Sequence, residues 1–218
     1  MIDSSIKPAS PRNIYTEFVN PGSKVPKAED IYILPVPFIT SILEIAPKIK
    51  KSGVWWAFGG DLSEKLGGVA IIPKEIEILT DSEGAEKIFA CLAEYNPTPI
   101  AVVEKKLDRQ AEIDGKKYPV LVRSHRTSLT VKGVEVIVHG DYQIRVGEWD
   151  WGDSLQFKSS IVNMTGTEIP VMPIRLSSEI YLTLGWLDRV QMIATAISNA
   201  HHAMGQYGAE MGYDSQAS

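Results

Sequence analysis

The chain has 218 residues, 44% of them hydrophobic, which is enough to fill the core of one ordinary domain. The formal net charge of −5 argues against a broad basic surface that follows the backbone of a long nucleic acid. No apolar run approaches the roughly 20 residues of a membrane-spanning helix, and the N-terminus lacks a signal-peptide pattern. We therefore expect a cytoplasmic protein with no membrane partner.

Residues 1–30 carry four prolines and few apolar runs, a composition typical of an extended arm. Such an arm is suited to wrapping a neighbouring subunit, so a homo-oligomer is one expectation. Apolar residues from Phe38 to Lys50 recur at helical spacing, and Pro47 is expected to break or kink the last turn.

The apolar run Val54–Phe58 predicts a buried strand that ends at Gly59 and Gly60. Asp61 can then cap a short helix, DLSEKLGG. Residues 69–79 are predicted to return as a strand or a pair of strands.

A helix is predicted over residues 82–95, with Thr80 or Asp81 as its N-cap. Ile100–Val103 is a strand candidate, and Asp114-Gly115 indicates a hairpin or an exposed loop.

Residues 118–149 are dominated by β-forming residues and predict successive antiparallel strands. A helical stripe then runs over residues 177–203, which Gly185 can divide in two. The expected organisation is an arm (1–30), an α+β core (31–160), a helical segment packed on the core (161–204) and a flexible tail (205–218).

The sequence EIEIL at residues 75–79 alternates strictly between acidic and apolar residues. Because strand side chains alternate between faces, Glu75 and Glu77 are expected to share one face, with isoleucines on the other. Two neighbouring carboxylates repel unless a cation lies between them, and a divalent cation with oxygen ligands suits such a pair. The simpler alternative is a strand whose glutamates face solvent.

Glu135 stands among valines and isoleucine in VEVIVHGD, on a strand that reads as apolar on both faces. An embedded charge needs a partner, so Glu135 is the candidate third carboxylate. Three carboxylates on neighbouring strands are suited to hold one or two Mg²⁺ ions. Gly59 and Gly60 leave backbone N–H groups open to phosphate oxygens, although two glycines alone indicate only a turn.

These features together resemble the nucleotidyltransferase superfamily named after DNA polymerase beta, and more narrowly its small stand-alone prokaryotic and archaeal members. The matching segments, within roughly residues 38–197, are WWAFGG, PKEIEILTD, GVEVIVHGD and PVMPIRLSSEIYLTLGWLDRVQMI. The resemblance implies an α+β fold with a mixed sheet flanked by helices and a C-terminal helical segment.

The resemblance also implies site roles. Gly59 and Gly60 would contact a nucleoside triphosphate, Glu75 and Glu77 would bind Mg²⁺ or Mn²⁺, and Glu135 would complete the metal site and assist the incoming hydroxyl. The chain departs from the family by having Glu-x-Glu in place of Asp-x-Asp, and Asp61 where the family usually has serine. Asp61 places negative charge near the phosphates unless a metal or Lys65 offsets it.

Several other residues have two interpretations. Arg123 and His125, beside Arg126, either contact the triphosphate or form the polar end of a strand. His139 follows Glu135 by four residues on the same strand face, so it is either a neighbour of the site or, as the favoured interpretation, a hydrogen-bonded structural histidine. Asp188-Arg189 is either an exposed helix pair or a support for the site.

Three functions remain open at this level. The first is a Mg²⁺-dependent transferase that moves a nucleoside monophosphate onto a hydroxyl of a small molecule, RNA or protein. The second is a relative without catalysis that binds nucleotides or proteins, and the third is the toxin of a toxin–antitoxin pair. The departures at Asp61 and at the glutamate pair favour considering the second.

Overall fold

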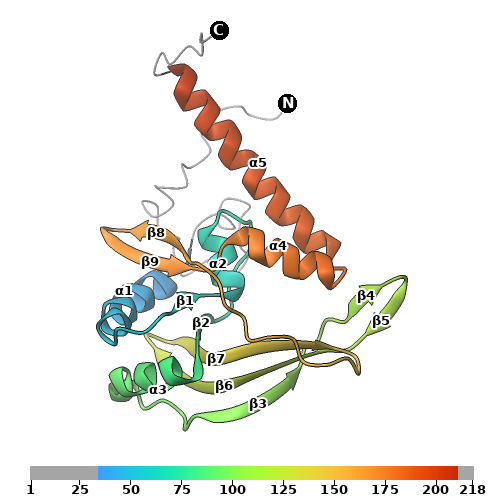
Figure 1. The fold of residues 1–218 in the computed structure, drawn as a ribbon. Coiled ribbons are helices and arrows are strands. Elements are labelled where there is room, and N and C mark those ends of the chain that lie inside the picture. Colours follow the sequence, from blue (N-terminus) through green and yellow to red (C-terminus); the bar gives the residue numbers. More distant parts are fainter. Residues whose placement is uncertain (1–33, 211–218) are drawn as a thin grey trace.

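The computed structural model describes residues 34–210, with side chains described up to residue 200. The arm expected over residues 1–30 and the last eight residues of the expected tail lie outside this range. The described part forms a mixed sheet flanked by helices and followed by a helical segment, which confirms the α+β fold class (Figure 1).

The main sheet has seven strands in the order β3-β6-β7-β2-β1-β9-β8. Their bounds are Ala57–Phe58 (β1), Ile76–Thr80 (β2), Ala101–Lys106 (β3), Val120–Val131 (β6), Val134–Val146 (β7), Ser160–Met164 (β8) and Thr167–Val171 (β9). β2 pairs with β7 in parallel and with β1 in antiparallel orientation. The expected hairpin at Asp114-Gly115 is confirmed, with strands β4 (Ala111–Ile113) and β5 (Lys116–Tyr118).

Two helices, α1 (Val36–Lys51) and α3 (Ser82–Cys91), pack against one face of this sheet. That face is apolar because the alternate residues of β2 and β7 on it are Ile76, Ile78, Val136 and Val138, all fully buried. A short 3₁₀ helix, η2 (Ala93–Tyr95), follows α3. The opposite alternation of β2 leaves Glu75 and Glu77 on the other side of the sheet.

Three further helices, α2 (Gly60–Leu66), α4 (Ile174–Thr183) and α5 (Leu187–Glu210), follow one another in contact: α2 packs on α4, and α4 on α5. In Figure 1, α5 (red) extends away from the sheet, and the β4–β5 hairpin projects from the far end of β6 and β7. Gly185 lies between α4 and α5 with a positive φ of 71°, so the predicted division of the last helix is confirmed. No described helix is long and apolar enough to cross a membrane.

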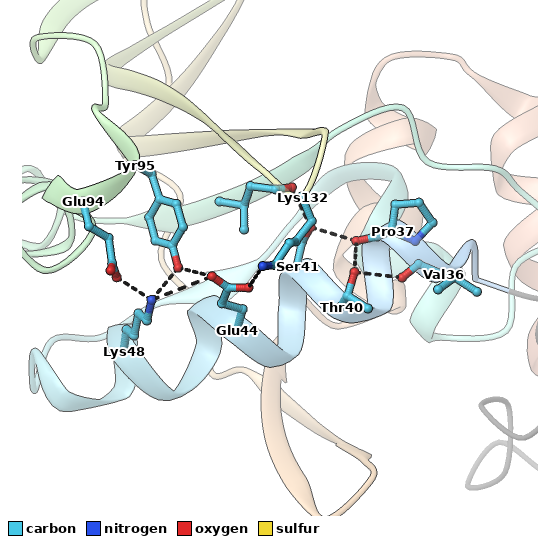
Figure 2. Close-up of polar contacts among 10 residues, drawn as sticks. Val36, Pro37, Thr40, Ser41, Glu44, Lys48, Glu94, Tyr95 and Lys132 are labelled. Atoms are coloured by element: carbon cyan, nitrogen blue, oxygen red, sulfur yellow. Dashed lines mark hydrogen bonds and ion pairs between the residues drawn. The ribbon is translucent and has the colours of Figure 1, made fainter. Parts of the chain in front are cut away.

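Polar contacts fasten α1 to the β6–β7 turn and to η2 (Figure 2). The Ser41 hydroxyl donates to the carbonyl of Val131 at 2.8 Å. Glu44 accepts a hydrogen bond from the Tyr95 hydroxyl and forms an ion pair with Lys132 at 3.1 Å. Lys48 completes the group by contacting Glu94 and Tyr95.

The structure differs from the expected secondary structure in several places. The strand expected over Val54–Phe58 is only Ala57–Phe58, and the strand expected within residues 69–79 begins at Ile76. Pro47 lies inside α1 without ending it, because its ring is on the exposed side, where solvent can reach the carbonyl left without a donor. Residues 160–171, expected mostly within the helical segment, instead form the β8–β9 hairpin, which extends the sheet beside β1. The alternation in TEIPV is short and contains a proline, and this hid the strand from sequence reading.

Candidate active site

Glu75 and Glu77 line a cavity of about 260 Å³ on the side of the sheet away from α1 and α3. The N–H of Gly59 donates to the Glu77 carbonyl at 2.9 Å and so fixes the backbone of Glu77. Asp61 also lines the cavity. Much of the remaining lining is apolar, formed by Leu107, Val120, Ile144, Leu155, Leu184 and Trp186.

Gly60 lies directly against the Glu77 carboxylate. Its φ is +55°, in the left-handed region that favours glycine, and a Cβ built on it would lie 1.7 Å from Glu77 Oε2. The absence of a side chain at Gly60 therefore leaves room for the Glu77 carboxylate. The predicted phosphate position lies next to that carboxylate.

The two carboxylates have the chemistry of a cation site. Burial raises the pKa of Glu75, and the charges of Glu77 and Glu135 raise it further. Mg²⁺ typically uses one or two carboxylates and takes its other ligands from water and phosphate oxygens, so this pair fits such an ion. A full three-carboxylate cage is not formed: among the described residues no group of three His, Cys, Asp or Glu side chains is arranged to hold a metal.

Glu135 lies outside the cavity lining, on the neighbouring strand β7. Its side chain is 54% exposed, and its Oε1 lies 4.0 Å from Nη2 of Arg126. The expectation of a strand covered on both faces does not hold at this position. Glu135 is nevertheless close to Glu75. In the parallel pair β2–β7, Ile76 is opposite Val136, so the residues that precede them, Glu75 and Glu135, are neighbours across the two strands.

His139 on β7 is a buried side chain beside the Glu77 carboxylate. Its Nε2 lies 3.6 Å from Glu77 Oε1, and its Nδ1 lies 2.8 Å from the Ser124 hydroxyl. The hydrogen bond to Ser124 agrees with a structural histidine. The other ring nitrogen has no hydrogen-bond partner and faces the candidate metal pair, so His139 also belongs to the surroundings of the site.

A β-bulge brings Tyr142 into the cavity. Asp141 has a φ of +52°, and the register between β6 and β7 shifts between Arg123 and His125. The extra residue reverses the alternation of β7, so that Tyr142 lines the cavity. Strand periodicity alone would have placed this tyrosine on the opposite face.

Asp61 is neutralised by a residue far away in the sequence. The Arg189 guanidinium on α5 donates to Asp61 Oδ1, and its Nη1 lies 3.5 Å from Glu64 Oε2. Glu64 is fully buried and accepts a second hydrogen bond from the Tyr181 hydroxyl on α4. The charge that we expected a metal or Lys65 to offset is therefore offset by Arg189. Asp188 and Arg189 do not act as one pair: Arg189 contacts the cavity residue Asp61, whereas Asp188 forms an exposed ion pair with Arg109.

Lys65 does not line the cavity. Its side chain is 2% exposed, its Nζ has no hydrogen-bond partner, and burial lowers the pKa of its amine to about 8. The structure gives no contact between this amine and the cavity residues.

Replacing Lys65 with methionine is expected to stabilise the protein at pH 7. A lysine whose folded pKa lies below its unfolded value of 10.5 costs stability while it is charged, and the folded protein regains stability as the pH rises from about 8 toward 10.5. We expect a gain of roughly 1–3 kcal/mol for Lys65→Met at pH 7 that shrinks by pH 10. Denaturant unfolding from pH 6 to 10 measures it, and a variant that is less stable than the parent at pH 7 would contradict the assignment.

Arg123 and His125 lie on the side of β6 opposite to the carboxylates. Arg123 donates two hydrogen bonds to Gln143 Oε1, and its guanidinium stacks on Trp151. His125 pairs across the strands with Gly140, which packs against α3. The third basic residue of the segment, Arg126, is the one on the carboxylate side, because it pairs with His139 and approaches Glu135.

No protein-family model and no curated protein matches the chain at a significant level. Two solved structures do. One is a proposed nucleotidyltransferase from Thermotoga maritima, with 23% identity and a TM-score of 0.55 over 76% of this chain and 96% of that one. The other is ANT(2″)-Ia in complex with adenylyl-2″-tobramycin, with 10% identity and a TM-score of 0.41 over 78% of this chain and 98% of that one. The first likeness shows that this chain has a nucleotidyltransferase-like fold.

Proposed function

We propose that the protein is a Mg²⁺-dependent nucleotidyltransferase that moves a nucleoside monophosphate from a nucleoside triphosphate to a hydroxyl acceptor. The observation that carries the proposal is the pair Glu75 and Glu77 in the lining of a cavity, with Gly60 so close to the Glu77 carboxylate that a Cβ would not fit. The nucleotidyltransferase-like fold supports it.

In this proposal Glu75 and Glu77 hold the metal, and the triphosphate lies beside Gly60, which lines the cavity. Gly59, for which the same role was predicted, is not available: its N–H donates to the Glu77 carbonyl, and Leu79 occupies the place of its Cβ. Mg²⁺ at this pair would neutralise the phosphate charge and polarise the α-phosphate. The guanidinium of Arg189 pairs with the Asp61 carboxylate in the cavity lining, and this positive charge reduces the repulsion between Asp61 and the phosphates. The apolar inner wall can exclude water from the reacting groups.

The reaction needs no oxidant or reductant. The acceptor oxygen bonds to the α-phosphorus, the bond from that phosphorus to the oxygen bridging to the β-phosphorus breaks, and pyrophosphate leaves. The acceptor proton passes to a base, for which Glu135 is the candidate because its exposed carboxylate lies next to Glu75.

A second candidate function is nucleotide binding without transfer. It is favoured by one observation: Glu135 lies outside the cavity lining and faces Arg126, so the described residues gather two carboxylates at the cavity and not three. Pyrophosphate release in the presence of candidate acceptors separates the two functions once nucleotide binding is established.

Thermal unfolding with Mg²⁺ and each nucleoside triphosphate tests the binding that both functions require. We expect a rise in melting temperature that needs both metal and nucleotide and is lost in Glu75→Gln and Glu77→Gln. Glu104→Gln is a matched control, since Glu104 is an exposed glutamate on β3 outside the cavity. The absence of any shift with every triphosphate in the parent protein would overturn the proposed function.

A further inference from the structure

An arginine without a hydrogen bond stands beside the carboxylate pair. Arg126 approaches Glu135 at 4.0 Å, which is beyond hydrogen-bonding length, and its Nε is buried without a partner. Three other arginines of the described residues are hydrogen-bonded: Arg109 to Asp188, Arg123 to Gln143 and Arg189 to Asp61. Arg145 also has a buried Nε without a partner, but its guanidinium lies over the Trp151 ring, 4.6 Å from the ring centroid. At Arg126 no hydrogen bond is recorded among the described residues, although its side chain is only 29% exposed.

A half-buried guanidinium without a hydrogen-bond partner is suited to bind an anion. Its N–H donors form a planar fork that matches the two oxygens of a carboxylate or a phosphate. Lys105 on β3 adds positive charge on the same side, since it pairs across the strands with Val122, which is four residues before Arg126 on β6 and shares its face. Positive charge therefore lies next to the carboxylates on the side of β6 and β3.

The order of the strands separates this charge from the glycine pair. In the order β3-β6-β7-β2-β1, Gly60 follows β1 on one side of Glu77, and Arg126 on β6 lies on the other. Neighbouring strands are about 4.8 Å apart, so the β6 backbone is about 10 Å from that of β2. If the triphosphate occupies the glycine side, the acceptor approaches from the side of Glu135 and Arg126.

We propose that Arg126 anchors an anionic group, a phosphate or a carboxylate, on a small acceptor that carries the reacting hydroxyl. This inference rests on the proposed function, since it assigns the acceptor side of the same site. An anion at Arg126 leaves the rest of the acceptor over Glu135 and Glu75. The acidic net charge of −5 favours a small anionic molecule over a long nucleic acid.

Side-chain NMR of the full chain with ¹⁵N-labelled arginine tests the inference. The probes are glycerol 3-phosphate, glycerate and neutral glycerol, each titrated with and without Mg²⁺ and a non-hydrolysable ATP analogue. We expect the Arg126 Nε–H signal to shift with at least one of the two anions and not with glycerol. The two anions distinguish a phosphate from a carboxylate as the preferred group.

The matched variants are Arg126→Gln and Arg123→Gln, neighbouring arginines of β6 on opposite sides of the sheet. Arg126→Gln should weaken binding of the preferred anion by about tenfold or more, while Arg123→Gln leaves it unchanged. Both variants should keep the parent affinity for the ATP analogue with Mg²⁺.

The inference would be overturned by no shift at Arg126 with either anion, by an equal shift with glycerol, or by a loss of affinity for the ATP analogue in Arg126→Gln as large as the loss for the anion. The last result would place the triphosphate itself at Arg126. A ribo-oligonucleotide that shifts the Arg126 signal at concentrations well below those of both small anions would also overturn it. Failure of the proposed function is a separate result, seen as the absence of any Mg²⁺-dependent nucleotide binding in the parent.

Discussion

Replacing Gly60 with alanine is expected to weaken Mg²⁺-dependent nucleotide binding by about a hundredfold while leaving the fold intact. A Cβ at this position would lie 1.7 Å from Glu77 Oε2, so the carboxylate must move by more than an ångström to restore an ordinary contact. The end of a glutamate side chain is flexible, and this movement costs little stability. It does displace a metal ligand, and such sites tolerate only about half an ångström of misplacement.

Gly68→Ala is the matched control for Gly60→Ala. Gly68 also has a positive φ, +92°, but a Cβ built there meets nothing within 4 Å. Both substitutions should cost about 1–2 kcal/mol of folding free energy through backbone strain. Only Gly60→Ala should lose nucleotide binding, measured by calorimetry with Mg²⁺ and the ATP analogue. Equal affinities in the two variants would show that Glu77 does not need its observed position.

Sequence reasoning succeeded where side chains alternate along a β-strand and one face of that strand is buried in the core. In EIEIL the isoleucines must face α1 and α3, so the faces of Glu75 and Glu77 follow from alternation. The β4–β5 hairpin and the division of the last helix at Gly185 followed from equally local signals. The mixed sheet followed only from the family resemblance, because local signals predicted antiparallel strands. The roles of the two glutamates remain predictions that the proposed experiments test.

The arrangement beyond these residues depends on features that alternation does not report. One extra residue at Asp141 reverses the alternation of β7, and this change puts Tyr142 into the cavity. The same shift lies between Arg123 and His125 on the partner strand β6. Alternation along β6 puts Arg123 and His125 on one face and Arg126 on the other, but only the pairing with β7 shows that the carboxylates lie on the side of Arg126.

The ion pairs between elements that are distant in sequence could not be predicted from the sequence either. The helix of Asp61, Glu64 and Lys65 reads as an ordinary charged surface helix, yet Glu64 and Lys65 are buried and Asp61 pairs with Arg189 on α5. Glu64 and Asp61 lie 125 and 128 positions before Arg189 in the sequence. A single sequence carries no periodic signal for such a contact.

Replacing Arg189 with methionine is expected to destabilise the protein by about 2–4 kcal/mol, because it removes the counter-charge of a fully buried carboxylate. Glu64 would keep only the hydrogen bond from Tyr181. The matched control is Arg109→Met, since Arg109 pairs with Asp188 on the surface, where both side chains are more than 40% exposed. An exposed pair contributes about 0–1 kcal/mol, so the control should change stability little.

The pH dependence of Arg189→Met identifies Glu64 as the cause. Burial raises the pKa of Glu64 even in the parent, and loss of the guanidinium should raise it further. A carboxyl with a raised folded pKa binds its proton more tightly in the folded state, so stability falls as the pH rises above the unfolded value of 4.5. The deficit of Arg189→Met should therefore be smaller at pH 5 than at pH 8, measured by denaturant unfolding.

Adding Glu64→Gln to Arg189→Met completes the test. The amide keeps an acceptor for the Tyr181 hydroxyl and removes the buried charge, so the double variant should recover part of the lost stability and lose most of its pH dependence. Nucleotide binding should not recover, because Asp61 would still face the cavity without its guanidinium. Recovery of stability without recovery of nucleotide binding would show that Arg189 has two separate roles. It neutralises Glu64 in the core, which stabilises the fold, and it neutralises Asp61 at the cavity, which permits nucleotide binding. Full recovery of both would instead assign Arg189 to the fold alone.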